Sequence, residues 1–75
     1  MKHIEALIDE GGEITVGAAD GVECAATAAD HHNTLVMLVR REGESVAALL
    51  KRLDRALGRY WATGETVDEV NSADD

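Results

Sequence analysis

Residues 45–60 read SVAALLKRLDRALGRY, and their apolar side chains recur at the spacing of one helical face. Ser45 is a typical N-cap, because its hydroxyl can accept a hydrogen bond from a free amide of the first turn. Gly64 is a typical C-terminal stop. The pattern predicts a long amphipathic helix whose apolar stripe consists of Val46, Leu49, Leu50, Leu53, Leu57 and Tyr60.

Before this helix, residues 34–39 (TLVMLV) are the strongest strand signal in the chain. They are apolar on both faces rather than alternating, so both faces of the strand should be covered. Further upstream, residues 13–16 alternate polar and apolar side chains, as a half-buried strand does. Residues 2–10 carry apolar side chains on one helical face and end at Gly11-Gly12, which predicts a short helix.

Asp20-Gly21 suits the positive φ angles of a tight hairpin turn. Residues 22–29 would then return antiparallel, and a two-residue turn would set Val16 opposite Ala25 and Ile14 opposite Thr27. The alanines of this return strand are weak strand formers. They indicate either an uncertain register or a thin place against which another element packs closely.

These elements predict an α+β fold with a short N-terminal helix, a three-stranded antiparallel meander and a long C-terminal helix packed on one sheet face. Thr66-Val67-Asp68-Glu69 has the form of a capping box, which predicts a final helical turn. We expect one domain over residues 1–71 and a frayed acidic tail at 72–75. The expected core is Leu7, Ile14, Val16, Leu35, Met37, Val39, Val46, Leu49, Leu50, Leu53 and Leu57.

One layer of helices leaves one face of the third strand uncovered. That face carries either Val36 and Leu38 or Leu35, Met37 and Val39. Small domains often gain stability by oligomerisation, and a single cysteine excludes an internal disulfide. An uncovered apolar strip commonly marks an interface, so we expect a homodimer with Val36 and Leu38 between its subunits.

The charge balance opposes binding to nucleic acid or to an anionic membrane. Fifteen acids against seven bases give a net charge of −8. No segment is long and apolar enough to span a bilayer, and the first residues meet acids too early for a signal peptide. The lone Cys24 fits a reducing compartment, so we expect a cytoplasmic protein.

The sequence offers no catalytic constellation, metal site or cofactor motif. His31, His32, Cys24 and Asp30 are the only grouped metal-ligand types, and adjacent histidines on extended backbone diverge. We therefore expect two loop histidines and a small core cysteine. A nucleophilic Cys24 would need a nearby base and a lowered pKa, and its place in a strand beside alanines is more typical of a small core residue. The chain is predicted not to be an enzyme.

The middle of the chain is basic. Residues 34–60 carry six bases and three acids, whereas the segments on either side are acidic. Lys51, Arg55 and Arg59 form one helical stripe with Arg52 beside it, which predicts a surface that binds an acidic protein partner. Alternatively, the acids of the rest of the chain could mimic the phosphates of DNA and inhibit a host nucleic-acid enzyme, as anti-restriction and anti-CRISPR proteins do.

Residues 45–57, SVAALLKRLDRAL, together with residues 66–71, TVDEVN, resemble small acidic proteins of phage and prophage genomes. The resemblance covers about a third of the chain and implies a phage-related, cytoplasmic accessory role. The order of three strands and a helix is also similar to the antitoxin domain of the HicB family, but the proline-containing strand motif of that family is absent. The expected function is a small interaction module that binds a protein.

Overall fold

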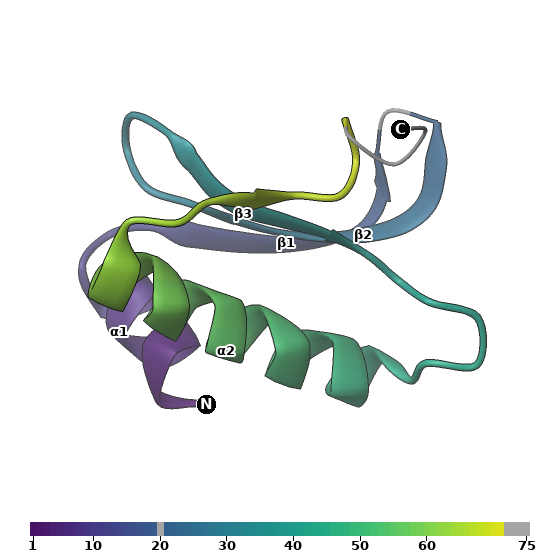
Figure 1. The fold of residues 1–75 in the computed structure, drawn as a ribbon, viewed down its shortest axis with the longest axis horizontal. Coiled ribbons are helices and arrows are strands. Elements are labelled where there is room, and N and C mark those ends of the chain that lie inside the picture. Colours follow the sequence, from purple (N-terminus) through teal and green to yellow (C-terminus); the bar gives the residue numbers. More distant parts are fainter. Residues whose placement is uncertain (20, 72–75) are drawn as a thin grey trace.

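The computed structural model describes residues 1–19 and 21–71, so the expected tail at 72–75 lies outside the described residues. Both helices lie on one face of a sheet, which gives two layers (Figure 1). The predicted α+β class and the antiparallel meander are confirmed, and a fourth strand is added. In chain order the elements are α1 (Lys2–Asp9), β1 (Glu13–Ala19), β2 (Val22–Ala29), β3 (Thr34–Val39), α2 (Val46–Thr63) and β4 (Val67–Asp68).

Helix α2 begins and ends where the sequence predicts. The Ser45 hydroxyl accepts a hydrogen bond from the amide of Ala48 at 3.0 Å. At the other end, Gly64 takes a φ of 78° and donates its amide to the Tyr60 carbonyl at 2.7 Å. The positive φ favours glycine because it has no Cβ to clash with the backbone. Between these two caps, Leu49, Leu53 and Leu57 are buried in the core.

The fourth strand corrects the prediction of a final helical turn. Val67 and Asp68 pair in parallel with Val36 and Met37 of β3. Glu69 then donates its amide to the Met37 carbonyl at 2.8 Å. The free edge of β3 supplies backbone partners to this segment, and this tertiary pairing overrides the local capping pattern.

The hairpin register is shifted by one residue from the prediction. Ile14 lies opposite Ala28 and Val16 opposite Ala26, because the pairing is irregular between Gly17 and Ala19. Gly17 has a φ of 147°, a backbone conformation that side-chain-bearing residues rarely adopt. Between the pairs of Gly17 and Ala19, β2 has one more residue than β1, which is the pattern of a β-bulge, and every pair farther from the turn is shifted by one position.

The core corrects the expected dimer interface. Val36 and Leu38 are 0% and 3% exposed, and they belong to one cluster with Leu49, Leu53 and Leu57 of α2. They face the helix and cannot meet a second subunit. Ala26 and Ala28 of β2 are also fully buried in this cluster, because their small side chains let α2 pack close to the sheet.

Other residues of the expected core are more exposed to solvent than the sequence predicts. Val16 and Val46 are exposed, whereas Met37 and Val39 are half-buried on the face of the sheet away from α2. A row of Thr15, Thr27 and Met37 crosses this open face, so it mixes polar and apolar side chains. The homodimer itself stays a prediction. In the described part of the chain, no helix has the length and apolar character to cross a membrane.

Candidate binding surfaces

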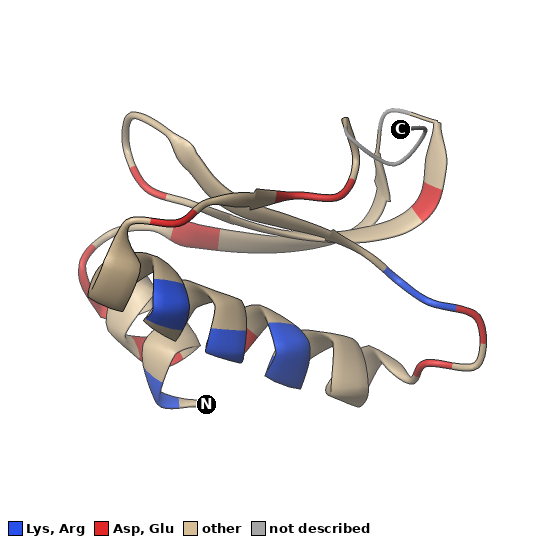
Figure 2. Ribbon diagram, in the orientation of Figure 1, with Lys and Arg blue, Asp and Glu red and all other residues tan. Residues whose placement is uncertain are grey.

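Charge is segregated on the described surface. Four of the seven lysine and arginine residues follow one another along α2, while most acids lie on α1, the sheet and the loops (Figure 2). Each of the four basic residues predicted to bind a partner belongs to α2. Their surroundings, however, divide them into one half-buried arginine and three exposed cations.

Arg52 is the centre of an internal network. Its Nε and Nη2 donate to the two carboxylate oxygens of Glu44 at 2.8 and 2.9 Å, and Nη2 also donates to the Val39 carbonyl at 2.8 Å. Its Nη1 lies 3.3 Å from Glu69 Oε2. The Arg52 side chain is only 12% exposed, and it joins α2 to the loop before it and to the segment after β4. Its contact with a partner stays a prediction.

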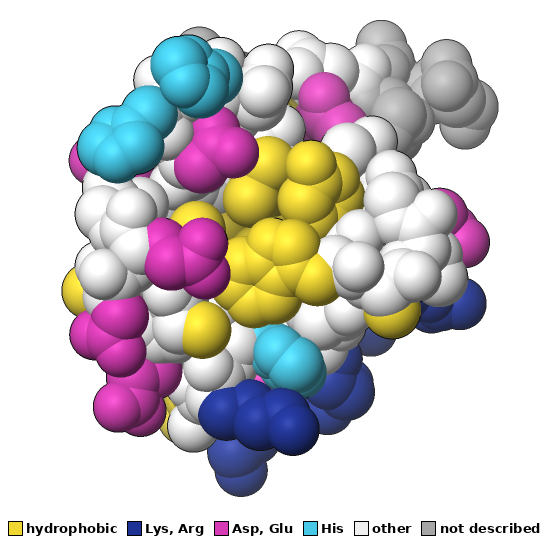
Figure 3. Space-filling view, turned by 90° about the vertical axis from the view of Figure 1, so that its left-hand side faces the viewer, with side chains coloured by type: hydrophobic (Ala, Val, Ile, Leu, Met, Phe, Trp, Pro, Cys, Tyr) yellow, Lys and Arg dark blue, Asp and Glu magenta, His cyan; other side chains and the backbone are white. Residues whose placement is uncertain are grey.

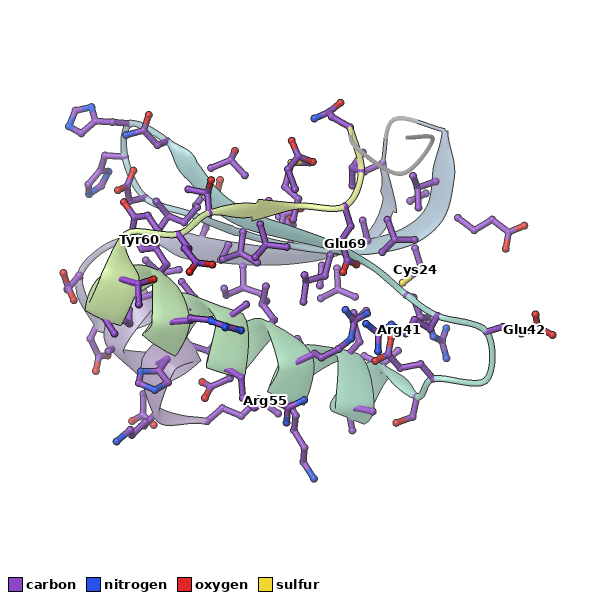
Figure 4. All side chains as sticks on the ribbon, in the orientation of Figure 1. Cys24, Arg41, Glu42, Arg55, Tyr60 and Glu69 are labelled. Carbon is purple, nitrogen blue, oxygen red and sulfur yellow. The ribbon has the colours of Figure 1, made fainter. Side chains whose placement is uncertain are left out.

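The same network lowers the pKa of Glu44. The hydrogen bond from Arg52, followed by that from the Arg41 amide, lowers the pKa of Glu44 to about 2. Figure 4 labels Arg41 in the loop before α2 and Glu69 on the sheet side of the network. Glu44 therefore stays ionised in the folded protein over most of the acid range.

This pKa predicts an acid-sensitive stability. As the pH falls from about 4.5 to about 2, the unfolded chain binds a proton at Glu44 before the folded chain does, so folding stability is lost across that window. Replacement of Glu44 by glutamine should lower stability at neutral pH and flatten the pH dependence in the window. Urea unfolding followed by circular dichroism at several pH values measures both effects. Glu42→Gln, in the same loop and exposed, is the control; an equal flattening there would contradict the assignment.

The other three predicted cations are exposed. No carboxylate of the described residues forms an ion pair with Lys51, Arg55 or Arg59. Arg55 and Arg59 line a groove of about 300 Å³ between α2 and β4, and Lys51 does not. We call it the α2–β4 groove, and it also contains apolar side chains of α2, β3 and β4.

At the C-terminal end of α2, Trp61 forms a second surface. Its side chain is 42% exposed, and it lines a depression of about 170 Å³ with Leu35 and with groups from the β2–β3 loop and α1. Figure 3 shows this end of the molecule, where a hydrophobic patch is bordered by acidic and histidine side chains. The Trp61 surface is defined here as Trp61, Leu35, Glu10, Asp30, His31 and His32.

The rim of the Trp61 surface is fixed by local hydrogen bonds. Asp30 Oδ1 accepts the amides of His32 and Asn33 at 2.8 and 2.7 Å. These bonds, that from His32 first, lower the pKa of Asp30, so it stays negatively charged. His31 rests against Gly11, where an added Cβ would lie 3.0 Å from its Nε2.

Helix α1 supplies the third histidine. The ring centroids of His3 and Trp61 are 6.0 Å apart. Asp54 of α2 holds this end of α1, because its Oδ1 accepts the amides of His3 and Ile4, both at 2.9 Å. Gly58 leaves room for the imidazole, since a Cβ there would lie 2.5 Å from His3 Nε2. All three histidines of the chain therefore adjoin Trp61 or its depression.

Sequence reasoning missed Trp61. It lies four residues after Leu57 and so continues one apolar row of α2. A lone tryptophan in a chain with no phenylalanine and a single tyrosine was the available signal. The sequence does not show that Glu10, Asp30 and the histidines, which belong to other elements, lie around Trp61 in the folded chain.

Cys24 lies apart from the histidines. It is half-buried, and it lines a shallow depression with the loop Arg40–Ser45, into which its sulfur points beneath the sheet (Figure 4). No histidine lines this depression within residues 1–19 and 21–71, so Cys24 has no imidazole base beside it there. The same residues contain no group of three histidine, cysteine or acidic side chains placed to hold a metal ion.

Comparison of the chain with protein-family models, curated proteins and solved structures finds no match.

Proposed function

We propose that this chain is a non-enzymatic interaction module that binds a protein partner through the Trp61 surface. The observation that carries the proposal is the half-exposed tryptophan with a polar rim. Tryptophan is enriched among the residues that dominate binding energy, and such residues lie at the centre of a patch surrounded by polar groups. The phage-related setting implied by the sequence resemblance remains a prediction.

The rim indicates the chemistry of the partner. Glu10 and Asp30 border the depression and carry negative charge, and the net charge of the chain is −8. A complementary partner presents an apolar side chain flanked by lysine or arginine, because opposite charges steer encounter and fix the register of docking. A cation can also rest on the face of the indole ring.

A peptide-display library tests the proposal, because its selection step requires no identified partner. Panning against the immobilised domain should enrich peptides that place an apolar residue between basic ones. Trp61→Ala should weaken binding of an enriched peptide at least about tenfold, as expected for a residue at the centre of an interface. Fluorescence anisotropy measures the affinity, and circular dichroism verifies that the variant is folded.

Val46→Ala is the matched control. Val46 lies on the same helix and has the same exposed fraction, 42%, but it is at the far end of α2 from Trp61. It should leave peptide affinity unchanged. Equal loss in both variants, or enrichment of peptides without basic residues, would contradict the assigned surface.

A DNA-mimic inhibitor is the second candidate. Glu5 and Asp9 of α1, Glu10 after it and Glu13 of β1 are all exposed and follow closely in the chain, which favours an anionic array. A mimic should be displaced from its target enzyme by duplex DNA and should lose affinity steeply with salt. Binding through the Trp61 surface should depend on salt more weakly, because burial of the apolar ring contributes much of the energy.

A further inference from the structure

The α2–β4 groove is a second site with a different chemistry. Arg55 and Arg59 project from α2 on one side, and Val67 of β4 lies on the other. Leu38 and Ala56 contribute apolar surface between them, and Arg52 and Glu69 complete the lining. Figure 4 labels Arg55 on the helix and Glu69 on the sheet side. The site thus has a basic wall and an apolar wall.

The charge in this groove is not neutralised by its surroundings. Three arginines and one glutamate line it, a net charge of +2 in a chain of net −8. Arg52 is engaged by Glu44 and Glu69, whereas Arg55 and Arg59 are exposed and form no ion pair with a described carboxylate. Paired cations without counter-charges are suited to carboxylates, which arginine binds in a fixed fork geometry.

The spacing of the two arginines fits an extended segment. Residues four apart on a helix are separated by about 6 Å along its axis. Side chains two apart on an extended strand point to the same side about 6.6 Å from one another. Two carboxylates at that interval can each meet one arginine, and the residue between them then points the opposite way, toward Val67.

From this geometry we infer that the α2–β4 groove binds an extended acidic protein segment of the pattern acidic–apolar–acidic. The carboxylates pair with Arg55 and Arg59, and the apolar side chain packs on Val67. A polynucleotide is disfavoured as the occupant, because the rest of this acidic molecule repels a polyanion of that length. The site is separate from the Trp61 surface, so the module can hold two segments of opposite charge.

A short capped peptide in which aspartate and leucine alternate is the probe. Titration into isotope-labelled domain, followed by NMR, should shift the Val67 methyl signals and the Arg55 and Arg59 side-chain signals. Arg55→Glu and Arg59→Glu should each weaken binding at least about tenfold, which corresponds to about 1.4 kcal/mol. The affinity should also fall when salt is raised from about 20 to about 500 mM.

Lys51→Glu is the matched control. Lys51 belongs to the same basic stripe and its replacement changes the net charge equally, but it does not line the groove. A loss equal to that of Arg55→Glu would overturn the inference, because it would show general attraction to the helix. Unchanged Val67 signals would also overturn it, as would equal binding of a peptide with its aspartates and leucines in separate blocks.

Tighter, Arg55-dependent binding of a single-stranded oligonucleotide would assign the groove to nucleic acid instead. Trp61→Ala should leave this peptide's affinity unchanged, so this site and the proposed function fail independently.

Discussion

Replacement of Leu53 by alanine is expected to cost about 2–5 kcal/mol of folding stability. Leu53 is 0% exposed at the middle of α2, and it belongs to the cluster that includes Val36 and Leu38 of β3. The substitution removes apolar contacts and leaves a cavity that rigid neighbours fill only in part. A domain of this size has a total stability on the order of 5 kcal/mol, so the variant should be largely unfolded. Urea unfolding followed by circular dichroism measures the loss.

Val46→Ala is again the control, because it shortens an apolar side chain of the same helix at an exposed position. Its free energy of unfolding should change by no more than about 0.5 kcal/mol. A Leu53→Ala variant as stable as this control would show that α2 does not pack on the sheet through that face.

Replacement of Arg52 by alanine is expected to have the second largest effect, a loss of about 2–4 kcal/mol. The substitution leaves the carboxylates of Glu44 and Glu69 and the Val39 carbonyl without their arginine donor. Polar groups left without partners in a mostly enclosed site cost more than the bonds themselves contribute. Thermal and urea unfolding should both show the loss.

Arg52→Lys should recover only part of this stability, because an ammonium group cannot make the fork-like contact with Glu44 while also reaching Val39. Lys51→Ala removes the neighbouring exposed cation and should change stability by no more than about 0.5 kcal/mol. If Lys51→Ala and Arg52→Ala were equally mild, the network would have no structural role.

The sequence predicts the elements whose signals are local. The caps of α2 at Ser45 and Gly64 and the Leu49, Leu53 and Leu57 stripe follow directly from helical periodicity. The three antiparallel strands are also predicted. The β-bulge at Gly17–Ala19 is not predicted. One extra residue changes the register of the hairpin, but it leaves the alternation of polar and apolar residues at 13–16 unchanged.

What the sequence could not predict is set by contacts between distant segments. The pattern of β3 does not say which of its two apolar faces α2 covers, and the wrong choice places Val36 and Leu38 in a dimer interface. Likewise, Arg52 belongs to the same run of basic residues as Lys51. Only the approach of Glu44 and Glu69 in the folded chain distinguishes a structural arginine from an exposed cation.

The hydrogen bonds between Asp54 and the first turn of α1 make the N-terminal helix depend on α2. Eight residues are too few for a helix to persist alone in water, and the amides that would fray first are held by a side chain some fifty positions away. The stability of helix α1 should therefore depend on its contact with α2, and α1 should be the first helix to detach. Because His3 then leaves Trp61, the emission of the one indole in the chain would register that early opening before the rest of the molecule melts.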